Sequence, residues 1–400
     1  MARGGSCCRR AGSRGDWDTM TSRQRRVGIV GAGQLARMMA QAAIPLDIEL
    51  VLLAEHADDG AAQVVPHVIV GSPDDPARLR ELADQVDVVT FDHELVDPAL
   101  LATLEQEGVQ VWPSAATMAL AQNKRRQRAE LSTAGFPAPR FQDVDSFADV
   151  RAFGEEHGWP VVLKASRGGY DGRGVWVARN AAAAQAIWDE AQAHGTVLLA
   201  EEWLSLDREF AVLVARRPSG ETVVYPAIET VQRDGMCNEL HVPLTADREL
   251  AAQAEDIARK IAGHIQSVGI LAVEFFVSNH TLLVNELAPR PHNSGHWTIE
   301  GAQTSQFEQH LRAVLDLPLG ATGVMGKAVA TVNVIGPKDG SDPRVRMADA
   351  MRVSGAHVHF YGKFARAGRK LGHVTVVGDD AGEVLARANN AARLLDGSGS

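Results

Sequence analysis

The sequence lacks the features that mark several classes of protein. Its 400 residues contain three cysteines, and Cys7, Cys8 and Cys237 have neither the number nor the spacing of a disulfide framework or a zinc site. No apolar run approaches the roughly eighteen residues of a membrane-spanning helix, and residues 1–20 lack the apolar centre of a signal peptide. We therefore expect a soluble, cytoplasmic protein with no membrane partner.

A long basic run is also missing, and the formal net charge is −10. We therefore expect no nucleic-acid partner, and any anionic substrate must be met by locally placed Lys and Arg. The composition, 45% hydrophobic and 22% charged, is that of a globular chain large enough for two or three packed domains.

The order of the segments predicts an α/β fold that becomes α+β in its C-terminal part. Residues 1–26 are rich in Gly, Ser and Arg and are expected to be a disordered extension. From 27 to 138, continuous apolar strands alternate with amphipathic helices, which predicts a doubly wound parallel sheet. We expect its strands at 27–31, 48–55, 86–92 and 109–113, and its helices at 33–43, 75–84, 98–107 and 115–133.

The rest of the chain divides into three further segments. Residues 139–200 predict a small α/β lid domain around a glycine-rich loop. Residues 201–390 predict β-rich hairpins with helices, ending in a β-rich subdomain, and 391–400 a flexible tail.

The most informative segment is a predicted hairpin with strands at 272–277 and from 284 onward. Glu274 and Glu286 are twelve positions apart, so strands that pair about residue 280 would place both carboxylates on one face, opposite each other. Such a pair is tolerated if one carboxylate is protonated or if a cation lies between them, and hard oxygen ligands suit Mg2+. We interpret this hairpin as the metal site of a nucleotide enzyme.

Two glycine-rich turns could bind phosphate. Residues 31–36, GAGQLA, fit the dinucleotide pattern with Glu55 at the end of the next strand, although such a turn accepts any phosphate or carboxylate. A nicotinamide dehydrogenase is therefore one alternative. Residues 166–174, SRGGYDGRG, follow Lys164 and could close on a nucleotide, or could be a mobile hairpin loop.

Four polar segments have two interpretations each. Residues 201–210, EEWLSLDREF, could present backbone groups to adenine or form an acidic solvated loop. Asp92 and Glu94 follow a sheet strand, where they could bind a ligand or cap a helix. Residues 289–297, PRPHNSGHW, suit a ligand loop or a structural turn, and the basic cluster at 360–370 suits a phosphomonoester or a surface loop.

The lid, the acidic segment at 201–210 and the paired glutamates together resemble the ATP-grasp fold. In order along the chain, GAGQLARM, TFDHE, KASRGGYDGRGVW, EEWLSLDREF, AVEFF, NELAPRPHNSGHW, QFEQHLRA and YGKFARAGRKLGH resemble the 5-(carboxyamino)imidazole ribonucleotide synthase family of purine biosynthesis, over roughly residues 27 to 385. The string NELAPRPHNSGHW carries most of this resemblance. The chain departs from the family at Gln232, where a histidine is usual, and at Asp92, where glutamate is commoner.

The resemblance implies an ATP-dependent carbon–nitrogen ligase, with Mg2+, that carboxylates aminoimidazole ribonucleotide with bicarbonate through carboxyphosphate. It implies a homodimer. Its nearest rival is the formate-dependent glycinamide ribonucleotide transformylase, whose relatives typically contain PRPHDTG instead.

The resemblance also implies a role for each matching residue. Glu274 and Glu286 would hold Mg2+, and Asp171 and Arg173 would act at the bicarbonate as catalytic residues. The nucleotide site would comprise Lys124, Lys164, Gly169, Tyr170, Asp171, Gly172, Arg173, Gly174, Val175, Glu201, Glu202, Trp203, Leu204, Glu209, Gln232, Asn285 and Glu286. The ribonucleotide site would comprise Gln34, Leu35, Glu94, Arg290, His292, Asn293, Ser294, Lys363, Arg369 and Lys370.

Overall fold

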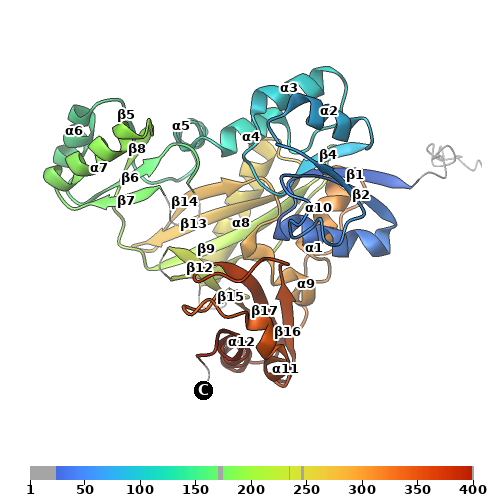
Figure 1. The fold of residues 1–400 in the computed structure, drawn as a ribbon. Coiled ribbons are helices and arrows are strands. Elements are labelled where there is room, and N and C mark those ends of the chain that lie inside the picture. The colour runs from blue at the N-terminus through green and yellow to red at the C-terminus, as the bar shows by residue number, and fades with distance from the viewer. Residues whose placement is uncertain (1–23, 170–173, 234, 245–246, 399–400) are drawn as a thin grey trace, which may run out of the picture.

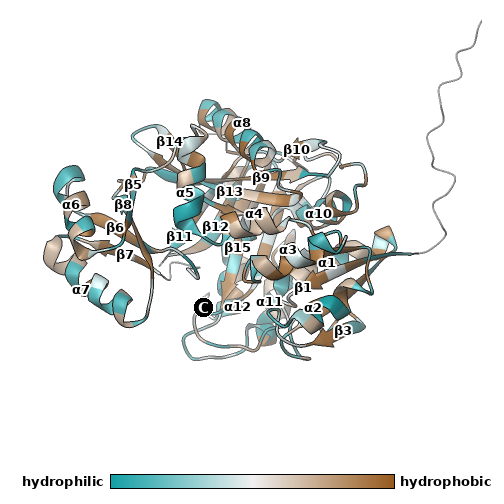
Figure 2. Ribbon diagram, turned by 90° about the horizontal axis from the view of Figure 1, so that it is seen from above, coloured by the Kyte–Doolittle hydropathy of each residue, from teal (hydrophilic) through white to brown (hydrophobic). Residues whose placement is uncertain are grey.

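The structure is a computed structural model that describes residues 24–169, 174–233, 235–244 and 247–398. The described strands form three sheets, and Figures 1 and 2 show that the sheet of residues 141–202 projects from one side of the molecule. None of the helices in these ranges has the length and hydropathy needed to cross a bilayer.

The N-terminal sheet is parallel, as predicted, in the order β3-β2-β1-β4. Its strands are β1 (Arg25–Val30), β2 (Ile48–Ala54), β3 (His67–Val70) and β4 (Val88–Phe91). Its helices are α1 (Gln34–Ala43), α2 (Pro76–Ala83) and α3 (Pro98–Gln106), with a 3-10 turn η1 (Ile44–Leu46) after α1. Apolar side chains of α1 pack on one face and those of α2 and α3 on the other, so the sheet is covered on both sides.

The prediction for this part of the chain needs four corrections. The extension does not reach residue 26, because β1 begins at Arg25 and pairs with β2. The edge strand β3 was missed because it is short and largely exposed. The strand predicted at 109–113 makes a single bridge, between Val111 and Val89. The single helix predicted at 115–133 is divided into two helices, α4 (Ala115–Ala121) and α5 (Lys124–Thr133). The division occurs where the Asn123 side chain caps the start of α5.

The small sheet is antiparallel in the order β5-β8-β6-β7. Its strands are β5 (Phe141–Val144), β6 (Val161–Ala165), β7 (Val175–Ala178) and β8 (Leu198–Glu202), and its helices are α6 (Phe147–His157) and α7 (Ala181–Ala193). The predicted lid at 139–200 therefore ends two residues early, and Glu201 and Glu202 belong to a strand rather than to the loop after it.

The large antiparallel sheet has the order β14-β13-β9-β11-β12-β15-β17-β16, with β10 on β9. Its strands are β9 (Arg208–Arg216), β10 (Thr222–Val224), β11 (Ile228–Arg233), β12 (Met236–Val242), β13 (Gly269–Ser278), β14 (Thr281–Ala288), β15 (Ala328–Ile335), β16 (Ala356–Phe360) and β17 (Lys370–Gly378). Because β12 pairs with β15, the predicted C-terminal subdomain continues this sheet.

Helices and short turns cover the large sheet. They are α8 (Arg248–His264), η2 (Asn293–Gly295), α9 (Thr298–Gly301), α10 (Gln306–Val314), η3 (Pro343–Arg346), α11 (Met347–Ala350) and α12 (Ala381–Asp396). Helix α10 contributes Phe307 and Leu311 to the core under β1 and β2, which joins the large sheet to the N-terminal one. The tail predicted from residue 391 is helical to Asp396, because Ala391, Ala392 and Leu395 pack into the core against β15 and β17.

Candidate active site

The hairpin of β13 and β14 brings the two predicted metal ligands together. Its turn consists of Asn279 and His280, both left-handed with φ of 48° and 59°, which matches the two-residue turns of tight hairpins. Glu274 pairs directly with Glu286, as the sequence predicts.

The cause of that pairing differs from the one predicted. Near the turn, Ser278 pairs with Thr281 and Phe275 with Val284, so this ladder is centred between residues 279 and 280 rather than at 280. A regular continuation would place Asn285 opposite Glu274. A bulge beyond Phe275 takes up Asn285 as an extra residue, and Glu286 thereby reaches the place opposite Glu274.

The two carboxylates form an electrostatically strained pair. Burial and the negative charges of Glu286 and Glu209 raise the pKa of Glu274 to about 7. The Asn285 amide nitrogen lies 3.4 Å from Glu274 Oε2 and donates to it. Two carboxylates and an amide oxygen fit Mg2+, which commonly takes one or two carboxylates and completes its shell with phosphate oxygens and water. In the described residues no group of three or more His, Cys, Asp or Glu is arranged for a metal, so phosphate oxygens would be needed here.

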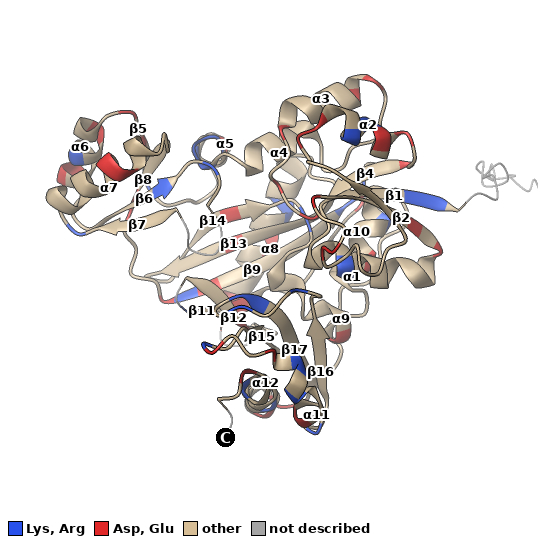
Figure 3. Ribbon diagram, viewed as in Figure 1, with Lys and Arg blue, Asp and Glu red and all other residues tan. Residues whose placement is uncertain are grey.

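Two lysines that were predicted at the nucleotide lie beside the bulge. Lys124, at the start of α5, places its Nζ 2.6 Å from Glu286 Oε1. Lys164, in β6, places its Nζ 2.7 Å from Glu201 Oε2 and 3.3 Å from Asn285 Oδ1. Figure 3 shows basic residues on α5 and β6 and acidic residues on β14 in this part of the molecule. Positive charges on two separate elements can therefore meet a polyphosphate above the carboxylates.

The segment predicted to hold adenine needs a partial correction. Glu201 is buried inside the small sheet, and its backbone is flanked by Phe141 of β5 and Val162 of β6. Although burial acts to raise it, the pKa of Glu201 is lowered to about 2 by Arg128 and Lys164. The Glu201 side chain thus forms ion pairs with Arg128 and Lys164 and holds them in place. Trp203 and Leu204 lie beyond the end of β8, where backbone groups can be offered to a base.

Glu209 and Gln232, predicted at the nucleotide, lie on neighbouring strands β9 and β11. Burial raises the pKa of Glu209, while the hydrogen bond from the Gln232 side chain and the charge of Lys164 oppose that rise. Gln232 therefore contacts Glu209, another residue predicted at the nucleotide.

The glycine-rich loop joins β6 to β7, with Lys164 opposite Val175 and Ala165 N donating to Gly174 O at 2.7 Å. Gly169 precedes the loop's central residues. The remaining predicted loop residues, Tyr170, Asp171, Gly172 and Arg173, lie outside the described residues.

The first glycine turn is occupied by a carboxyl group of the protein itself. Asp92 Oδ2 accepts from Gly33 N at 2.5 Å, and a Cβ at Gly31, whose φ is +103°, would collide with Asp92 Oδ1. Burial raises the pKa of Asp92. A dinucleotide pyrophosphate needs these amides at the helix N-terminus. The turn therefore does not support the dehydrogenase alternative, and Gln34 and Leu35 follow it at the start of α1.

The predicted acceptor residues meet at the end of the hairpin. The Arg290 guanidinium makes a two-pronged ion pair with Glu94, its Nη2 3.0 Å from Oε1, and Arg290 lowers the pKa of Glu94 to about 2 despite burial. His292 Nε2 lies 3.8 Å from Glu274 Oε1, and His292 Nδ1 lies 2.9 Å from Ser294 Oγ. The short turn η2 thus sets Ser294 against His292, whose ring lies next to Glu274.

The basic loop between β16 and β17 reaches the same region. Lys363 Nζ lies 5.6 Å from the centre of the Tyr361 ring, and Arg369 Nη1 donates to Phe364 O at 3.3 Å. The charge of Lys370 acts on Glu274, whose pKa it lowers against the larger opposing effects. A segment far along the chain therefore supplies cations near the hairpin.

Three family models match in the order of these parts. They are a ribonucleotide synthetase preATP-grasp domain at residues 24–122, an ATP-grasp domain at 129–307 and a phosphoribosylaminoimidazole carboxylase C-terminal domain at 329–387. The N5-carboxyaminoimidazole ribonucleotide synthase of Mycobacterium tuberculosis (strain ATCC 25618 / H37Rv) is 46% identical over 375 residues, covering 92% of this chain and 87% of the relative. The chain belongs to the N5-carboxyaminoimidazole ribonucleotide synthase family.

More distant members of the family match over the same length. The Vibrio cholerae synthase is 36% identical over 93% of this chain and 96% of its own. The Thermus thermophilus structure has a TM-score of 0.81 at 36% identity, covering 92% of this chain and 97% of that one. The Aspergillus clavatus synthase, solved with ADP and 5-aminoimidazole ribonucleotide, has a TM-score of 0.86 at 31% identity, covering 93% and 99%. These likenesses confirm the ATP-grasp fold.

The sequence reasoning missed one buried arginine and one buried pair of histidines. Arg128 lies one helical turn after Lys124, so the two side chains share a face of α5. That i, i+4 spacing is the signal in the sequence that could have placed Arg128 at the site. His296 and His373 stack with ring centres 4.8 Å apart between the acceptor loop and β17, and no local pattern marks this contact.

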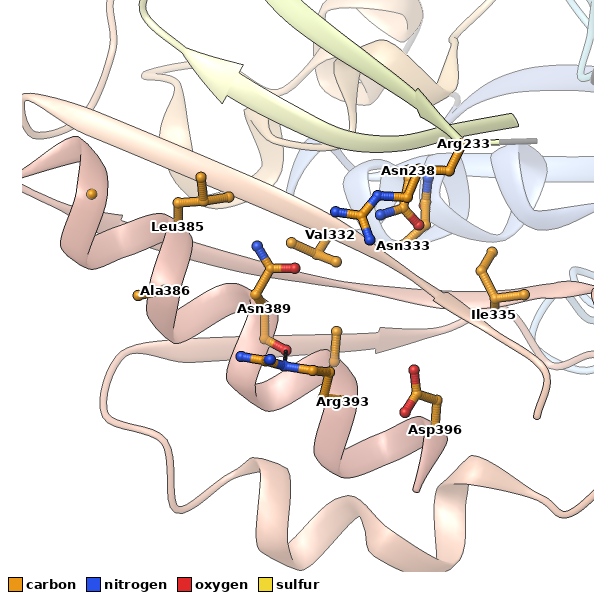
Figure 4. Close-up of a pocket in the computed structure, with 12 residues that line it drawn as sticks. Arg233, Asn238, Val332, Asn333, Ile335, Leu385, Ala386, Asn389, Arg393 and Asp396 are labelled. Carbon is orange, nitrogen blue, oxygen red and sulfur yellow. Dashed lines mark hydrogen bonds between the residues drawn. The ribbon is translucent and has the colours of Figure 1, made fainter. Parts of the chain in front are cut away.

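A polar cavity of about 510 Å³ lies elsewhere, between α12, β12 and β15 (Figure 4). Arg233, Asn238, Asn333, Asn389 and Arg393 line it, and it contains none of the predicted site residues. The ion-paired cluster at the hairpin is therefore the candidate active site, since it brings together the carboxylates, lysines and acceptor residues.

Proposed function

We propose that the protein catalyses the ATP-dependent carboxylation of 5-aminoimidazole ribonucleotide by bicarbonate, giving N5-carboxyaminoimidazole ribonucleotide, ADP and phosphate for purine biosynthesis. The observation that carries the proposal is the position of Glu274. One of its oxygens lies 3.4 Å from Asn285 on the lysine side, and the other lies 3.8 Å from His292 on the acceptor side. Nucleotide and acceptor chemistry can therefore meet at one carboxylate.

The proposed reaction has two steps. A bicarbonate oxygen forms a bond to the γ-phosphorus of ATP as the bond to ADP breaks, which yields carboxyphosphate. The exocyclic amine of the acceptor then bonds to the carboxyl carbon, either directly or after its release as CO2, phosphate leaves, and the amine proton passes to a base. Both steps require charge neutralisation and exclusion of water more than a protein nucleophile.

The residues divide between these requirements. Lys124 and Lys164 place positive charge where the phosphates would lie, and Glu274 and Glu286 would hold Mg2+ with Asn285. The ion would supply neutralisation of phosphate charge. We assign the nucleotide to the side of Leu204, Glu209 and Gln232.

On the other side, we assign the ribonucleotide to the residues at the end of the hairpin and to the basic loop of β16 and β17. Asp171 and Arg173, from the lid loop, are proposed to act at the bicarbonate. We extend the proposal to a homodimer, which sedimentation equilibrium of the purified chain would test.

Labelled bicarbonate tests the reaction directly. Incubation with ATP, Mg2+ and 5-aminoimidazole ribonucleotide is expected to give labelled carboxylated product and one ADP per product. Release of ADP with glycinamide ribonucleotide and formate, but not with the first pair of substrates, would show that the formyl-transferring alternative is correct. NADH binding in place of ATP binding would restore the dehydrogenase alternative.

A further inference from the structure

The buried guanidinium of Arg128 contacts both walls of the nucleotide site. Arg128 lies on α5, and its side chain and that of Glu201 are each 3% exposed. Its Nε lies 2.6 Å from Glu201 Oε1 in the small sheet. Its Nη2 donates at 2.7 Å to the backbone carbonyl of Asn285, the extra residue of the bulge. One side chain thus connects the small sheet to the hairpin at the residue that sets the Glu274–Glu286 pairing.

The bulge requires such a partner. A bulge removes its extra residue from the regular ladder, so the backbone carbonyl of that residue needs another donor when it is buried. The planar fork of arginine donates to a carboxylate and a carbonyl in fixed directions, whereas the three donors of a lysine ammonium rotate freely and fix neither direction.

The Arg128 guanidinium is also linked to Lys164, the lysine of β6, through Glu201. Glu201 binds Arg128 with one oxygen and Lys164 with the other, and Lys164 in turn reaches the Asn285 amide oxygen. The backbone and the side chain of Asn285 are therefore held by cations that share one carboxylate. This ring of contacts is closed, so a shift of Arg128 would move the bulge and Lys164 together.

We propose that Arg128 is a positioning residue that fixes the Asn285 bulge so that Glu274 and Glu286 can hold Mg2+ with the nucleotide. The inference rests on the proposed function. It requires no contact between Arg128 and the substrate.

Arg125 offers a matched control one turn earlier on the same helix. Its Nε donates to Leu198 O at 2.9 Å and its Nη1 to Asp145 at 2.8 Å. It therefore connects α5 to the small sheet as Arg128 does, yet these bonds do not include the hairpin. A variant at Arg125 tests for loosened packing of the small sheet alone.

The test is the affinity for ADP with and without Mg2+, measured by isothermal titration calorimetry on the full chain. For Arg128→Lys, the gain in affinity that Mg2+ gives should shrink by about tenfold to a hundredfold, as for residues that orient metal ligands. Mg2+-free binding of ADP should weaken less than binding with Mg2+, because it depends on Lys164 but not on the two carboxylates. Arg125→Lys should keep the whole gain.

Each result decides the matter. A full Mg2+ gain in Arg128→Lys, or an equal loss in Arg125→Lys, would overturn the role of Arg128. If thermal unfolding shows that Arg128→Lys does not fold, Arg128→Gln takes its place with the same expected loss. If the parent protein gains nothing from Mg2+, the proposed function fails as well, whereas a gain in the parent matched by the variant refutes this inference alone.

Discussion

Glu274 and Glu286 face each other across a ladder in a partly buried site, where like charges are costly. Burial and the nearby carboxylates raise the pKa of Glu274 to about 7, from an ordinary value of 4.5. The folded protein holds this proton more tightly than the unfolded chain. The proton therefore stabilises the fold fully below pH 4.5, and this contribution is lost as the pH rises through about 7. A bound cation would offset that loss by favouring the ionised pair.

Replacement of Glu286 tests the metal ligands singly. Glu286→Gln keeps the size of the side chain and removes one ligand charge, so kcat/KM for ATP should fall on the order of a hundredfold. Steady-state assays over a range of Mg2+ concentration would measure it. Glu81→Gln, on α2 and paired with Arg78, is the matched control and should be neutral. Full activity in Glu286→Gln would remove Glu286 from the metal site.

At this scale, the chemical role of a side chain is easier to predict from the sequence than its burial is. The spacing predicted that Glu274 faces Glu286, but it assumed a ladder centred on residue 280, whereas the pairing depends on the bulge at Asn285. Arg128 was missed because KRRQRAE resembles a solvated helix face. Its burial arises from packing against β8 and β14, which are distant in sequence.

At the scale of elements, the hairpin shows how one residue changes a site without changing a fold. Residues beyond the bulge pair as Val273 with Leu287 and Ala272 with Ala288. These pairs would have the same partners in a shorter, regular hairpin that lacked Asn285. The bulge therefore adds the side-chain amide and backbone carbonyl of Asn285 and a local twist. It does this without changing the pairing of the residues beyond it.

Deletion of Asn285 separates these contributions. The deletion should leave Glu286 opposite Glu274 and keep the fold, while ATP turnover falls below that of Asn285→Ala, which retains the bulge and its carbonyl. Thermal unfolding and ADP release would be compared in the two variants. Equal turnover in both would show that only the amide matters, contrary to the role given to the bulge.

Elements themselves were largely predictable, and the errors have physical causes. The alternation of apolar strands and amphipathic helices gave the parallel sheet. The break between α4 and α5 was missed because Asn123 acts through a single capping bond. The helix to Asp396 was underestimated because its buried alanines resemble the small residues of a tail.

At the scale of the whole molecule, His310 joins three parts of the fold. Ile270 N donates to its Nδ1 at 3.0 Å, so its Nε2 carries the proton and donates to Thr90 Oγ1 at 2.8 Å. The ring thus connects α10 to β13 and β4. Burial lowers the pKa of His310 to about 3, which keeps the ring neutral in the folded protein.

This histidine predicts acid sensitivity. A base with a lowered pKa contributes stability that is fully present above about 6.5 and is lost as pH falls towards 3, by up to about 1.4 kcal/mol per pH unit. His310→Leu should be less stable at pH 7.5, and its free energy of unfolding should fall less steeply between pH 6.5 and 5. Urea unfolding would measure both.

The exposed His194 at the end of α7 gives the control. His194→Leu makes the same change at the surface, and the slopes of the two variants would be compared. The buried His296 and His373, whose pKa values burial also lowers, act in the same direction, so some slope should survive in His310→Leu. An unchanged slope in His310→Leu would contradict the assignment.

The carboxyl group of Asp92 in the first glycine turn has a consequence for how substrates are sorted. The N-terminal sheet resembles a general phosphate receptor, but its amide at Gly33 is already bonded to Asp92. Under the proposed function, an anionic acceptor would draw cations from the loop between β16 and β17, which lie at the other end of the strand order from β14. A fragment ending before β15 is therefore expected not to bind the ribonucleotide, because the proposed site combines residues from the first and last segments of the chain.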